Sequence, residues 1–246
     1  MRFLILSDIH ANLEALNAVL RDAASRRYQA ILCLGDIVGY GPNPNEVTAW
    51  ARANADVVIR GNHDKSCSGA TSYESFNPAA QCSSRWTQGQ LLEEHAQWLL
   101  HLDRGPVLVE DFELVHGSPD DEDRYMFHEH DAEIGFINSE AQLTFFGHTH
   151  VQGGFIGEQA GRYLDISRLN ALPNEIAILP YRSYLLNPGA VGQPRDGDAR
   201  AAYCLYDSTT RAVEFFRVAY DIRTVQDKIL ACGLPQELAF RLASGD

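Results

Sequence analysis

Positive charge is scarce in this chain. Its 246 residues include 20 lysine and arginine residues against 33 aspartate and glutamate residues, which gives a formal net charge of −13. Proteins that bind the backbone of long nucleic acids need a basic patch or groove, and the sequence has no basic cluster of that kind. We therefore expect no long nucleic-acid partner, although a metal site would still attract small phosphate compounds.

A recognisable cysteine pattern is also lacking. The chain has five cysteines, an odd number, and their spacing fits neither a zinc–thiolate site nor a redox motif. Cys33 and Cys204 stand in apolar, strand-like runs and are expected to be small core residues.

Long apolar runs are absent too. No stretch approaches the roughly 20 apolar residues that a membrane-spanning helix needs, and the first residues show no basic, apolar and cleavable leader. We predict a cytoplasmic protein without a membrane partner. The sequence leaves the oligomeric state open.

What the chain does have is a set of five short apolar runs that end in aspartate, asparagine or histidine. These runs are residues 3–10 (FLILSDIH), 31–36 (ILCLGD), 56–64 (DVVIRGNHD), 112–117 (FELVHG) and 143–150 (LTFFGHTH). Their length and their β-branched and aromatic residues predict buried strands. Helix-like stretches between the first three runs predict right-handed crossovers and parallel strand pairs.

The polar residues that end these runs are expected to meet. Sites in parallel sheets lie beyond the carboxyl ends of the strands. The residues concerned are Asp8, His10, Asp36, Asn62, His63, His116, His148 and His150. Carboxylate, amide and imidazole donors suit manganese, iron, zinc or magnesium.

The number of donors predicts two metal ions. Seven of these side chains are too many for one ion and sufficient for two ions that share a ligand. One ion is expected to be held by Asp8, His10 and His150, and the other by Asn62, His116 and His148. Asp36 would bridge them, because a carboxylate has two oxygens to share. The expected cofactors are two divalent ions per chain, manganese first, with iron or zinc as alternatives.

His63 is the one histidine of this group that is not assigned as a metal ligand. It follows the ligand Asn62 directly. We expect His63 to be catalytic, either by protonating the leaving oxygen or by stabilising charge in the transition state. The neighbouring Asp64 is not assigned as its partner, since adjacency in sequence does not place a carboxylate against the ring.

The order of the motifs resembles a known family. The segments DIH, GDIVGYGP, GNHD, VHG and GHTH, in this order, resemble the calcineurin-like metallophosphoesterase superfamily over residues 1–150, and NPGAVGQPRDG at 187–197 extends the resemblance. The resemblance implies an α/β fold, a four-layer α/β/β/α sandwich of two mixed sheets flanked by helices. It also implies a dinuclear metal hydrolase, and it supports the ligand assignment above.

One motif departs from the protein-phosphatase relatives. Those proteins continue the bridging aspartate motif as GDxxDRG, whereas this chain has Gly39 and Tyr40 at the corresponding positions. The aspartate that would orient His63 and the arginine that would hold phosphate are missing from this motif. The segments SDIHANLEAL and GDIVGYGPNP are more similar to the small bacterial and archaeal phosphodiesterase-type branch.

Four residues are candidate substrate contacts. Asn12 would cap a helix that starts beside the site, donate to phosphate, or do both. Tyr40 lies in a glycine- and proline-rich loop and would reach the rim of the site. Asn62 would contact both metal and substrate. Arg195, in the loop at 187–197, would contact phosphate or would be an exposed residue without a role.

The acidic segment at residues 118–133 (SPDDEDRYMFHEHDAE) allows two interpretations. It is a solvated loop, or it is a lid over the metals with Arg124, Tyr125 and Phe127 as substrate contacts. The HEH sequence within it has ligand-like spacing, but nothing nearby supplies further donors at strand ends.

The segment between the third and fourth strands is expected to be loop and then helix. Residues 65–77 are predicted to form a loop, and Asn77 and Pro78 are predicted to start a helix. An apolar stripe over 91–102 has helical spacing, and His95 on that stripe is expected to be structural.

The later half of the chain is predicted to be mainly β. Short alternating strands, including a hairpin with its second strand at 162–166, are expected to build the second sheet. Residues 169–181 are predicted to be a loop with a short strand, and the tail is predicted to form two helices at 222–232 and 235–243. Since no linker or repeat is evident, we expect a single domain over residues 1–246.

These features together predict an enzyme. We expect a dinuclear metal-dependent phosphoesterase that hydrolyses small phosphodiesters or phosphomonoesters through a metal-bridged hydroxide. The alternatives are a serine/threonine-type protein phosphatase, a dinucleoside polyphosphate hydrolase or a nuclease. A non-catalytic metal-binding scaffold is the alternative outside enzymes, but it would have no reason to keep His63.

Overall fold

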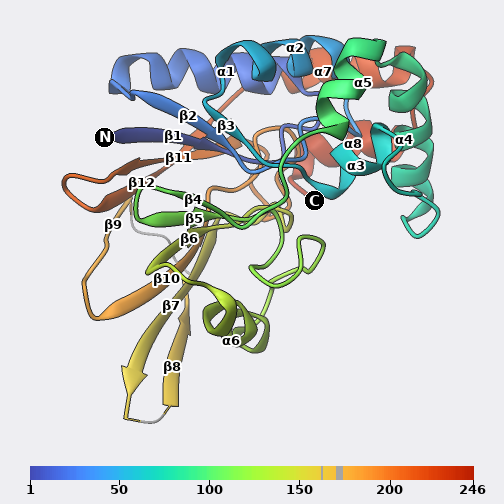
Figure 1. Cartoon of the computed structure of the whole chain (residues 1–246). Helices are drawn as coiled ribbons and strands as arrows, with labels where there is room; N and C mark the ends of the chain where they lie inside the picture. Colours follow the sequence, from blue (N-terminus) through green and yellow to red (C-terminus); the bar gives the residue numbers. More distant parts are fainter. Residues whose placement is uncertain (162, 170–173) are drawn as a thin grey trace.

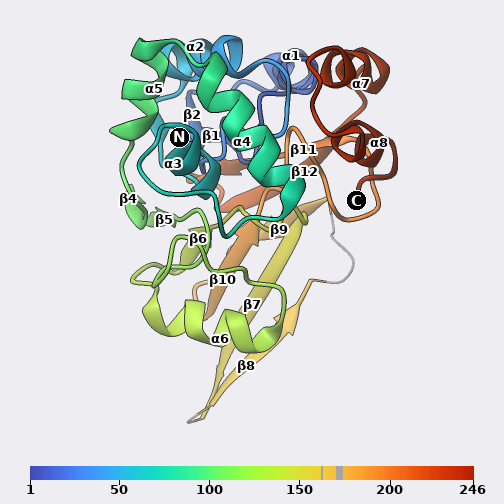
Figure 2. The ribbon, with the colours of Figure 1, turned by 90° about the vertical axis from the view of Figure 1, so that its right-hand side faces the viewer.

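Two six-stranded sheets lie face to face in the computed structural model, which describes residues 1–161, 163–169 and 174–246 (Figures 1 and 2). The first sheet contains, in spatial order, β3 (Val57–Val58), β2 (Ala30–Cys33), β1 (Arg2–Leu6), β11 (Ala201–Asp207), β12 (Ala212–Val218) and β9 (Glu175–Ala177). The second contains β4 (Val107–Val109), β5 (Phe112–Leu114), β6 (Leu143–Phe145), β10 (Arg182–Asn187), β7 (Gly153–Ala160) and β8 (Tyr163–Arg168). All five predicted apolar runs form strands, namely β1, β2, β3, β5 and β6.

The side chains of β1 show why the first run is apolar throughout. Phe3 and Ile5 enter the core between the two sheets. Leu4 and Leu6 point the other way, into the core between the first sheet and its helices. A strand that is buried on both faces has no position for a polar side chain until it ends.

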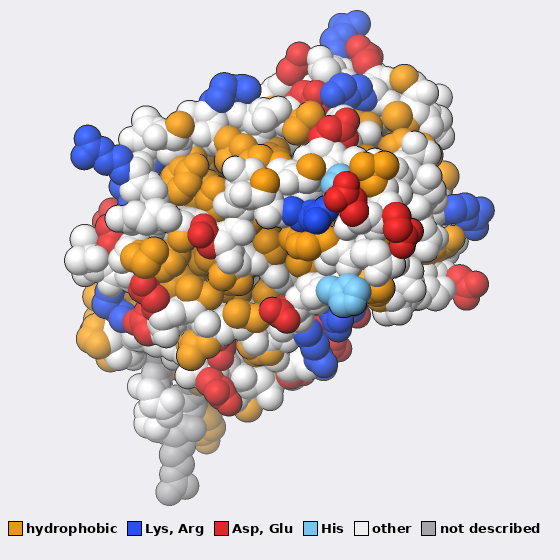
Figure 3. All heavy atoms as spheres, turned by 45° about the horizontal axis from the view of Figure 1, so that its top comes forward, with side chains coloured by type: hydrophobic (Ala, Val, Ile, Leu, Met, Phe, Trp, Pro, Cys, Tyr) orange, Lys and Arg blue, Asp and Glu red, His pale blue; other side chains and the backbone are white. Residues whose placement is uncertain are grey.

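Helices cover both outer faces, but unequally. The first sheet is covered by α1 (Leu13–Ala23), α2 (Pro44–Asn54), α5 (Glu93–Leu100), α7 (Ile222–Ala231) and α8 (Gln236–Ser244), with α3 (Asn62–Cys67) and α4 (Pro78–Gln90) beside them. On the second sheet, α6 (Glu129–Asn138) packs against β7, β8 and β10. The expected four-layer α/β/β/α sandwich is therefore confirmed. On the helical side drawn in Figure 3, lysine and arginine side chains lie among acidic and apolar ones.

Two expectations about local structure were partly wrong. Residues 65–67 are not loop, because they complete α3, which starts within the GNHD motif. The strands after His150 do not all build the second sheet: β9, β11 and β12 join the first sheet, where β11 pairs antiparallel with β1. The predicted start of α4 is confirmed, since the side chain of Asn77 accepts a hydrogen bond from the Ala80 N–H at 3.0 Å.

The hairpin after the last metal motif is longer than predicted, with β7 and β8 paired from Ala160 and Tyr163 onwards. Residue 162, where its second strand was expected to start, lies outside the described residues, as do residues 170–173 of the predicted loop. The short strand predicted near that loop is β9. Within the described parts of the chain, no helix is long and apolar enough to cross a membrane.

Candidate metal centre

The predicted donors meet at one edge of the sandwich because their strands run parallel. β1, β2 and β3 are parallel neighbours in the first sheet, and β5 and β6 are parallel neighbours in the second. Their carboxyl ends therefore lie at the same edge, and the loops that follow, together with the start of α3, carry every predicted donor.

The first group of donors is buried and compact. Asp8, His10, Asp36 and His150 each place one donor atom within 4.8 Å of the others. The Nε2 atoms of His10 and His150 are 3.1 Å apart. Nε2 of His150 lies 3.3 Å from the Asp8 carboxylate, and Nε2 of His10 lies 3.5 Å from the Asp36 carboxylate.

The second group shares Asp36 with the first. Asp36, His116 and His148 place donor atoms within 4.8 Å of one another. Nε2 of His116 lies 3.5 Å from the Asp36 carboxylate and 3.2 Å from the side-chain oxygen of Asn62. The structure thus brings together the two sets that the sequence predicted, with Asp36 between them.

Hydrogen bonds to carbonyl groups fix the orientation of these imidazoles. Nδ1 of His10 donates to the Val38 carbonyl at 2.9 Å, and Nδ1 of His150 donates to the Gln193 carbonyl at 2.7 Å. A ring that uses Nδ1–H in this way leaves Nε2 as a lone-pair donor. His116 follows the same rule, with Nδ1 bonded to the Leu34 carbonyl at 2.8 Å.

This arrangement fits a bound cation. Two lone pairs that face each other at 3.1 Å, as those of His10 and His150 do, repel unless a positive charge lies between them. All these atoms are buried, so water cannot disperse the repulsion. Divalent ions are the charges that such oxygen and imidazole sets hold in proteins.

The electrostatics of the site point the same way. Burial lowers the pKa of His148 to about 3, so this ring is neutral near pH 7. Burial alone would raise the pKa of Asp36, but the nearby imidazoles, His116 first, hold it well below its usual range. Burial likewise opposes a proton on His116, yet the Asp36 carboxylate raises the pKa of His116 to about 10. Both a proton on His116 and a bound metal ion would balance the negative charge of the Asp36 carboxylate. Protonation of His116 and metal binding therefore compete.

The backbone of the donor loops is unusual. Five donors have left-handed φ angles: Asp8 at 53°, His10 at 48°, Asp36 at 53°, His148 at 64° and His150 at 59°. For a residue other than glycine, such a conformation costs about 1–3 kcal/mol and persists only where the surroundings enforce it. Hydrogen bonds between the loops do so here. The Asp8 N–H donates to the Gly35 carbonyl at 3.1 Å, and the His10 N–H donates to the Asp36 carbonyl at 2.9 Å.

Asp64 is one of the residues that hold these loops, a role that sequence reasoning missed. Its carboxylate accepts hydrogen bonds from the N–H groups of Ile37 and Val38 at 2.9 and 3.2 Å, and from that of Gly61 at 2.9 Å. Burial, with repulsion from Asp36, raises its pKa to about 7. The Asp64 carboxylate is occupied by these backbone bonds, so Asp64 is not the hydrogen-bond partner of the His63 ring, which the sequence left unassigned.

His63 is fixed by packing. Its ring lies 4.4 Å from that of Tyr40 and 4.9 Å from that of Phe76, centroid to centroid. Its Nδ1 is buried without a hydrogen-bond partner among the described residues. Gly39, with φ at +86°, makes room for the ring, because a Cβ there would lie 2.5 Å from Nδ1. Burial lowers the pKa of His63 to about 4, although Asp36 opposes this.

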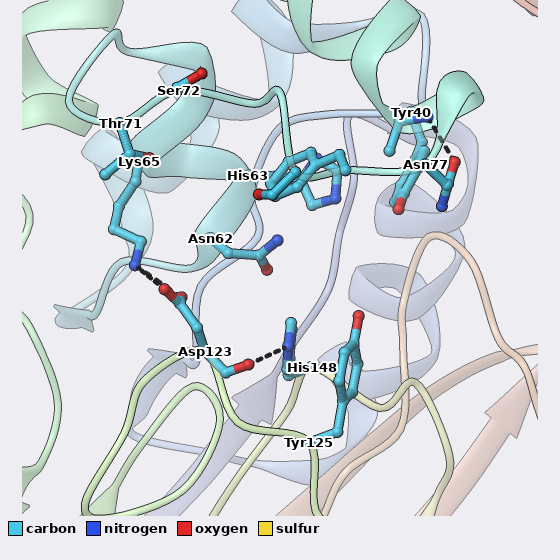
Figure 4. A pocket seen from close by; sticks show the side chains of 13 residues that line it. Tyr40, Asn62, His63, Lys65, Thr71, Ser72, Asn77, Asp123, Tyr125 and His148 are labelled. Carbon is cyan, nitrogen blue, oxygen red and sulfur yellow. Dashed lines mark hydrogen bonds and ion pairs between the residues drawn. The ribbon is translucent and has the colours of Figure 1, made fainter.

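A cavity of about 490 Å³ opens beside the second donor group. Asn62, His63 and His148 line its inner end, together with Tyr40 and Tyr125 (Figure 4). The Tyr125 hydroxyl points into the cavity (Figure 4). The ring of Tyr125 stacks on that of His148 at a centroid distance of 3.8 Å.

The acidic segment contributes to the site instead of remaining solvated. The backbone carbonyl of Asp123 accepts a hydrogen bond from Nε2 of His148 at 3.1 Å, which leaves Nδ1 of this ring as the donor. The Asp123 side chain is paired with the ammonium of Lys65 at 2.7 Å (Figure 4). Lys65 is almost fully buried and also reaches Glu122 at 3.0 Å. Lys65, Glu122 and Asp123 therefore anchor the segment that orients His148, and the sequence reasoning did not identify this network.

The other expected contacts of the acidic segment differ in position. Tyr125 is the one expected contact that lines the cavity, while Arg124 pairs with Asp120 at 2.7 Å. Phe127 is partly exposed and stacks on Tyr125. The two histidines of HEH stand at the start of α6, where His130 is exposed and lies 3.8 Å from Glu133.

The predicted substrate contacts have different surroundings. Asn12 makes two hydrogen bonds within the chain: its side-chain oxygen accepts from the Ala15 N–H at 3.1 Å and its nitrogen donates to the Gly192 carbonyl at 2.8 Å. This geometry favours the helix cap. Tyr40 is buried beside His10 and lines the cavity. Arg195 lies with its guanidinium carbon 5.5 Å from the centre of the Tyr40 ring, and its Nε has no partner within the described chain.

Comparisons with known proteins identify the family of this chain. Residues 1–211 match the family described as the calcineurin-like phosphoesterase superfamily domain. The chain belongs to this superfamily. A metallophosphoesterase of Sphaerobacter thermophilus is 41% identical, with a TM-score of 0.87 over 100% of this chain and 99% of that one. An uncharacterized protein of Methanocaldococcus jannaschii is 35% identical over 98% of this chain and 97% of its own length.

A more distant structure supports the fold alone. A hypothetical protein of Pyrococcus horikoshii has a TM-score of 0.78 at 21% identity, over 100% of this chain and 98% of that one. Membership of the calcineurin-like phosphoesterase superfamily supports a phosphoester hydrolase in general, and the buried aspartate and histidine clusters could bind metal.

Proposed function

We propose that this protein is a dinuclear metal-dependent phosphoesterase that acts on small phosphodiesters or phosphomonoesters. The observation that supports it most is the pair of buried donor groups that share the Asp36 carboxylate. One ion would be held by Asp8, His10 and His150, and the other by Asn62, His116 and His148. We propose manganese as the metal, with iron or zinc as alternatives, since these donors accept all three.

The chain's own residues prepare the site for a phosphate group. Two divalent ions in such a site polarise a phosphoryl group and lower the pKa of a water molecule. Carbonyl acceptors hold the imidazoles of His10, His116 and His150 in the tautomer that presents Nε2. The left-handed loops keep the donors converged before any ligand arrives, which avoids reorganisation during the reaction.

His63 serves the transition state as a hydrogen-bond donor in this proposal. The sequence left two roles open, proton donation and charge stabilisation. Because burial holds its pKa at about 4, the ring is neutral near pH 7, and two nearby divalent ions would lower that pKa further. A neutral imidazole retains one N–H, which it can direct at a phosphate oxygen from the cavity wall.

The surroundings of the site favour small substrates. The cavity beside the second donor group, at about 490 Å³, is of the size that small-molecule ligands occupy. Gly39 and Tyr40 stand where protein-phosphatase relatives carry aspartate and arginine. These two features count against the protein-phosphatase alternative.

A panel of phosphate esters tests the proposal. The manganese-loaded protein is expected to hydrolyse chromogenic phosphodiesters or phosphomonoesters, to lose this activity on chelation and to regain it when manganese is restored. Phosphoserine protein and duplex DNA are expected to be poor substrates. Rapid turnover of the phosphoprotein with little hydrolysis of small esters would show that the proposed substrate class is wrong.

A further inference from the structure

The charged side chains at the cavity beside the metal donors are paired with one another, and this pairing indicates which kind of ligand the cavity can bind. Lys65 and Asp123 line it, and the two are paired with each other at 2.7 Å. Lys65 also pairs with Glu122, which in turn accepts two hydrogen bonds from Arg60 at 2.9 and 3.0 Å. The network therefore contains two cationic and two anionic side chains. Among the described residues that line the cavity, Lys65 is the only lysine or arginine, and its charge is already matched.

One wall of the cavity consists of aromatic rings. Tyr40, His63 and Phe76 follow one another at centroid distances of 4.4 and 4.9 Å. Tyr125 closes the opposite side next to His148 (Figure 4). Rings of this kind favour planar groups that can stack on them or pack edge to face.

The outer wall is polar but uncharged. It is formed by Thr71, Ser72, Ser75 and Asn77, which precede or start α4. Hydroxyl and amide groups of this kind bind neutral hydrogen-bonding groups on a ligand.

We propose that this cavity binds the organic part of the phosphate ester, and that it selects an uncharged group with a planar ring, of nucleoside size or smaller. The inference rests on the proposed function, because it requires the phosphate to lie on the metal donors Asn62 and His148 at the inner end. It adds a rule for the substrate: the group bound next to the phosphate carries no second negative charge. A dinucleoside polyphosphate, whose chain continues as further phosphates, is disfavoured for the same reason.

Two phosphonates that cannot be hydrolysed test the charge rule directly. Calorimetry on the manganese-loaded protein compares benzylphosphonate with 4-carboxybenzylphosphonate, which differ by one carboxylate on the ring. The wild-type protein is expected to bind benzylphosphonate more tightly. Asp123→Asn removes one of the two anionic partners of Lys65, but it keeps the pair of Lys65 with Glu122 and the backbone carbonyl that orients His148. The variant should therefore still bind two ions per chain.

The variant should shift the preference towards the charged ligand. The expected shift in the ratio of dissociation constants is about 3- to 10-fold, because the Asp123 side chain is 52% exposed and water screens part of the effect. Raising the salt concentration should reduce the shift. Asp120→Asn is the matched control. It removes the same charge from the same segment, where Asp120 pairs with Arg124 outside the cavity wall, and it should leave the ratio unchanged.

A second variant tests the preference for a planar ring. Phe76→Ala should weaken binding of benzylphosphonate by about 3- to 10-fold. It should leave binding of methylphosphonate, which lacks a ring, nearly unchanged. Phe76→Leu keeps apolar bulk without a ring, so its effect separates stacking from simple burial.

The outcomes separate this inference from the proposed function. If the wild-type protein binds the charged phosphonate as well as the uncharged one, and Asp123→Asn does not change the ratio, the charge rule is wrong. If Phe76→Ala affects both uncharged phosphonates equally, the ring does not lie in this cavity. If the manganese-loaded protein binds neither phosphonates nor inorganic phosphate, the proposed function itself fails, and the inference fails with it.

Discussion

Replacing His63 by alanine should slow hydrolysis while both metal groups stay intact. The ring makes no hydrogen bond within the described chain, so no donor loses its partner when the ring is removed. The hydrogen bond that connects this residue to the site comes from its backbone: the His63 N–H donates to the Asp36 carboxylate at 2.9 Å. This bond remains in the variant. Metal content should therefore be unchanged.

The size of the effect follows from the protonation state of the ring. With a pKa of about 4, His63 offers an N–H but no readily released proton at pH 7. Loss of one such donor to a charged oxygen typically costs about 10²- to 10³-fold in rate. The loss should be the same, within about 3-fold, for esters with weakly and strongly basic leaving groups, because a hydrogen bond to phosphate serves both.

The assay measures kcat/KM for a series of aryl and alkyl esters, together with metal content by elemental analysis. His63→Gln retains an N–H donor and should recover part of the rate. His95→Ala is the control: His95 is also buried, but it bonds to Asn45 at 2.9 Å away from the donors, and its removal should not affect hydrolysis. A loss that grows tenfold or more with the basicity of the leaving group would make His63 the proton donor. Loss of metal in proportion to activity would make it a structural support.

Three further predictions concern the metals. Asp36→Asn removes the negative ligand that both groups share, so elemental analysis should show fewer than two ions per chain, and kcat/KM should fall by more than about 10²-fold. Lys65→Met should weaken binding of one of the two ions by about 10- to 100-fold in a calorimetric titration, since it releases the segment that orients His148. The control Lys228→Met breaks an ion pair with Glu14 elsewhere and should leave both affinities unchanged. Chelation should lower the melting temperature, and manganese at 100 times its dissociation constant should restore about 2.7 kcal/mol of stability; an unchanged melting temperature would contradict coupling of metal binding to folding.

Asp8 and Asp36 could be predicted from the sequence because β1 and β2, which precede them, are buried on both faces. Such a strand is apolar until it ends, so the first polar residues after it mark the edge of the sheet. Asp8 after β1 and Asp36 after β2 are both found in this way, and parallel pairing then brings them together. The same reasoning does not predict the left-handed φ angles of Asp8 and Asp36. Such angles are usually predicted from a glycine, and neither residue is one.

Contacts between distant segments could not be predicted in this way. The apolar run of β11 fits either sheet, and its place beside β1 depends on packing such as Phe3 against Tyr206. Lys65 and Asp123 are 58 residues apart, and the acidic run around Asp123 has the composition of a solvated loop. Only the folded chain shows that Lys65 pairs with Glu122 and Asp123 of this run and that the backbone of Asp123 orients His148.

The most direct test of the dinuclear centre is a manganese titration of the metal-free protein followed by electron paramagnetic resonance. The shared Asp36 carboxylate predicts saturation at two ions per chain, with a spectrum of two magnetically coupled manganese ions that Asp36→Asn abolishes. Saturation at one ion per chain, or a spectrum of isolated ions only, would contradict a centre bridged by Asp36.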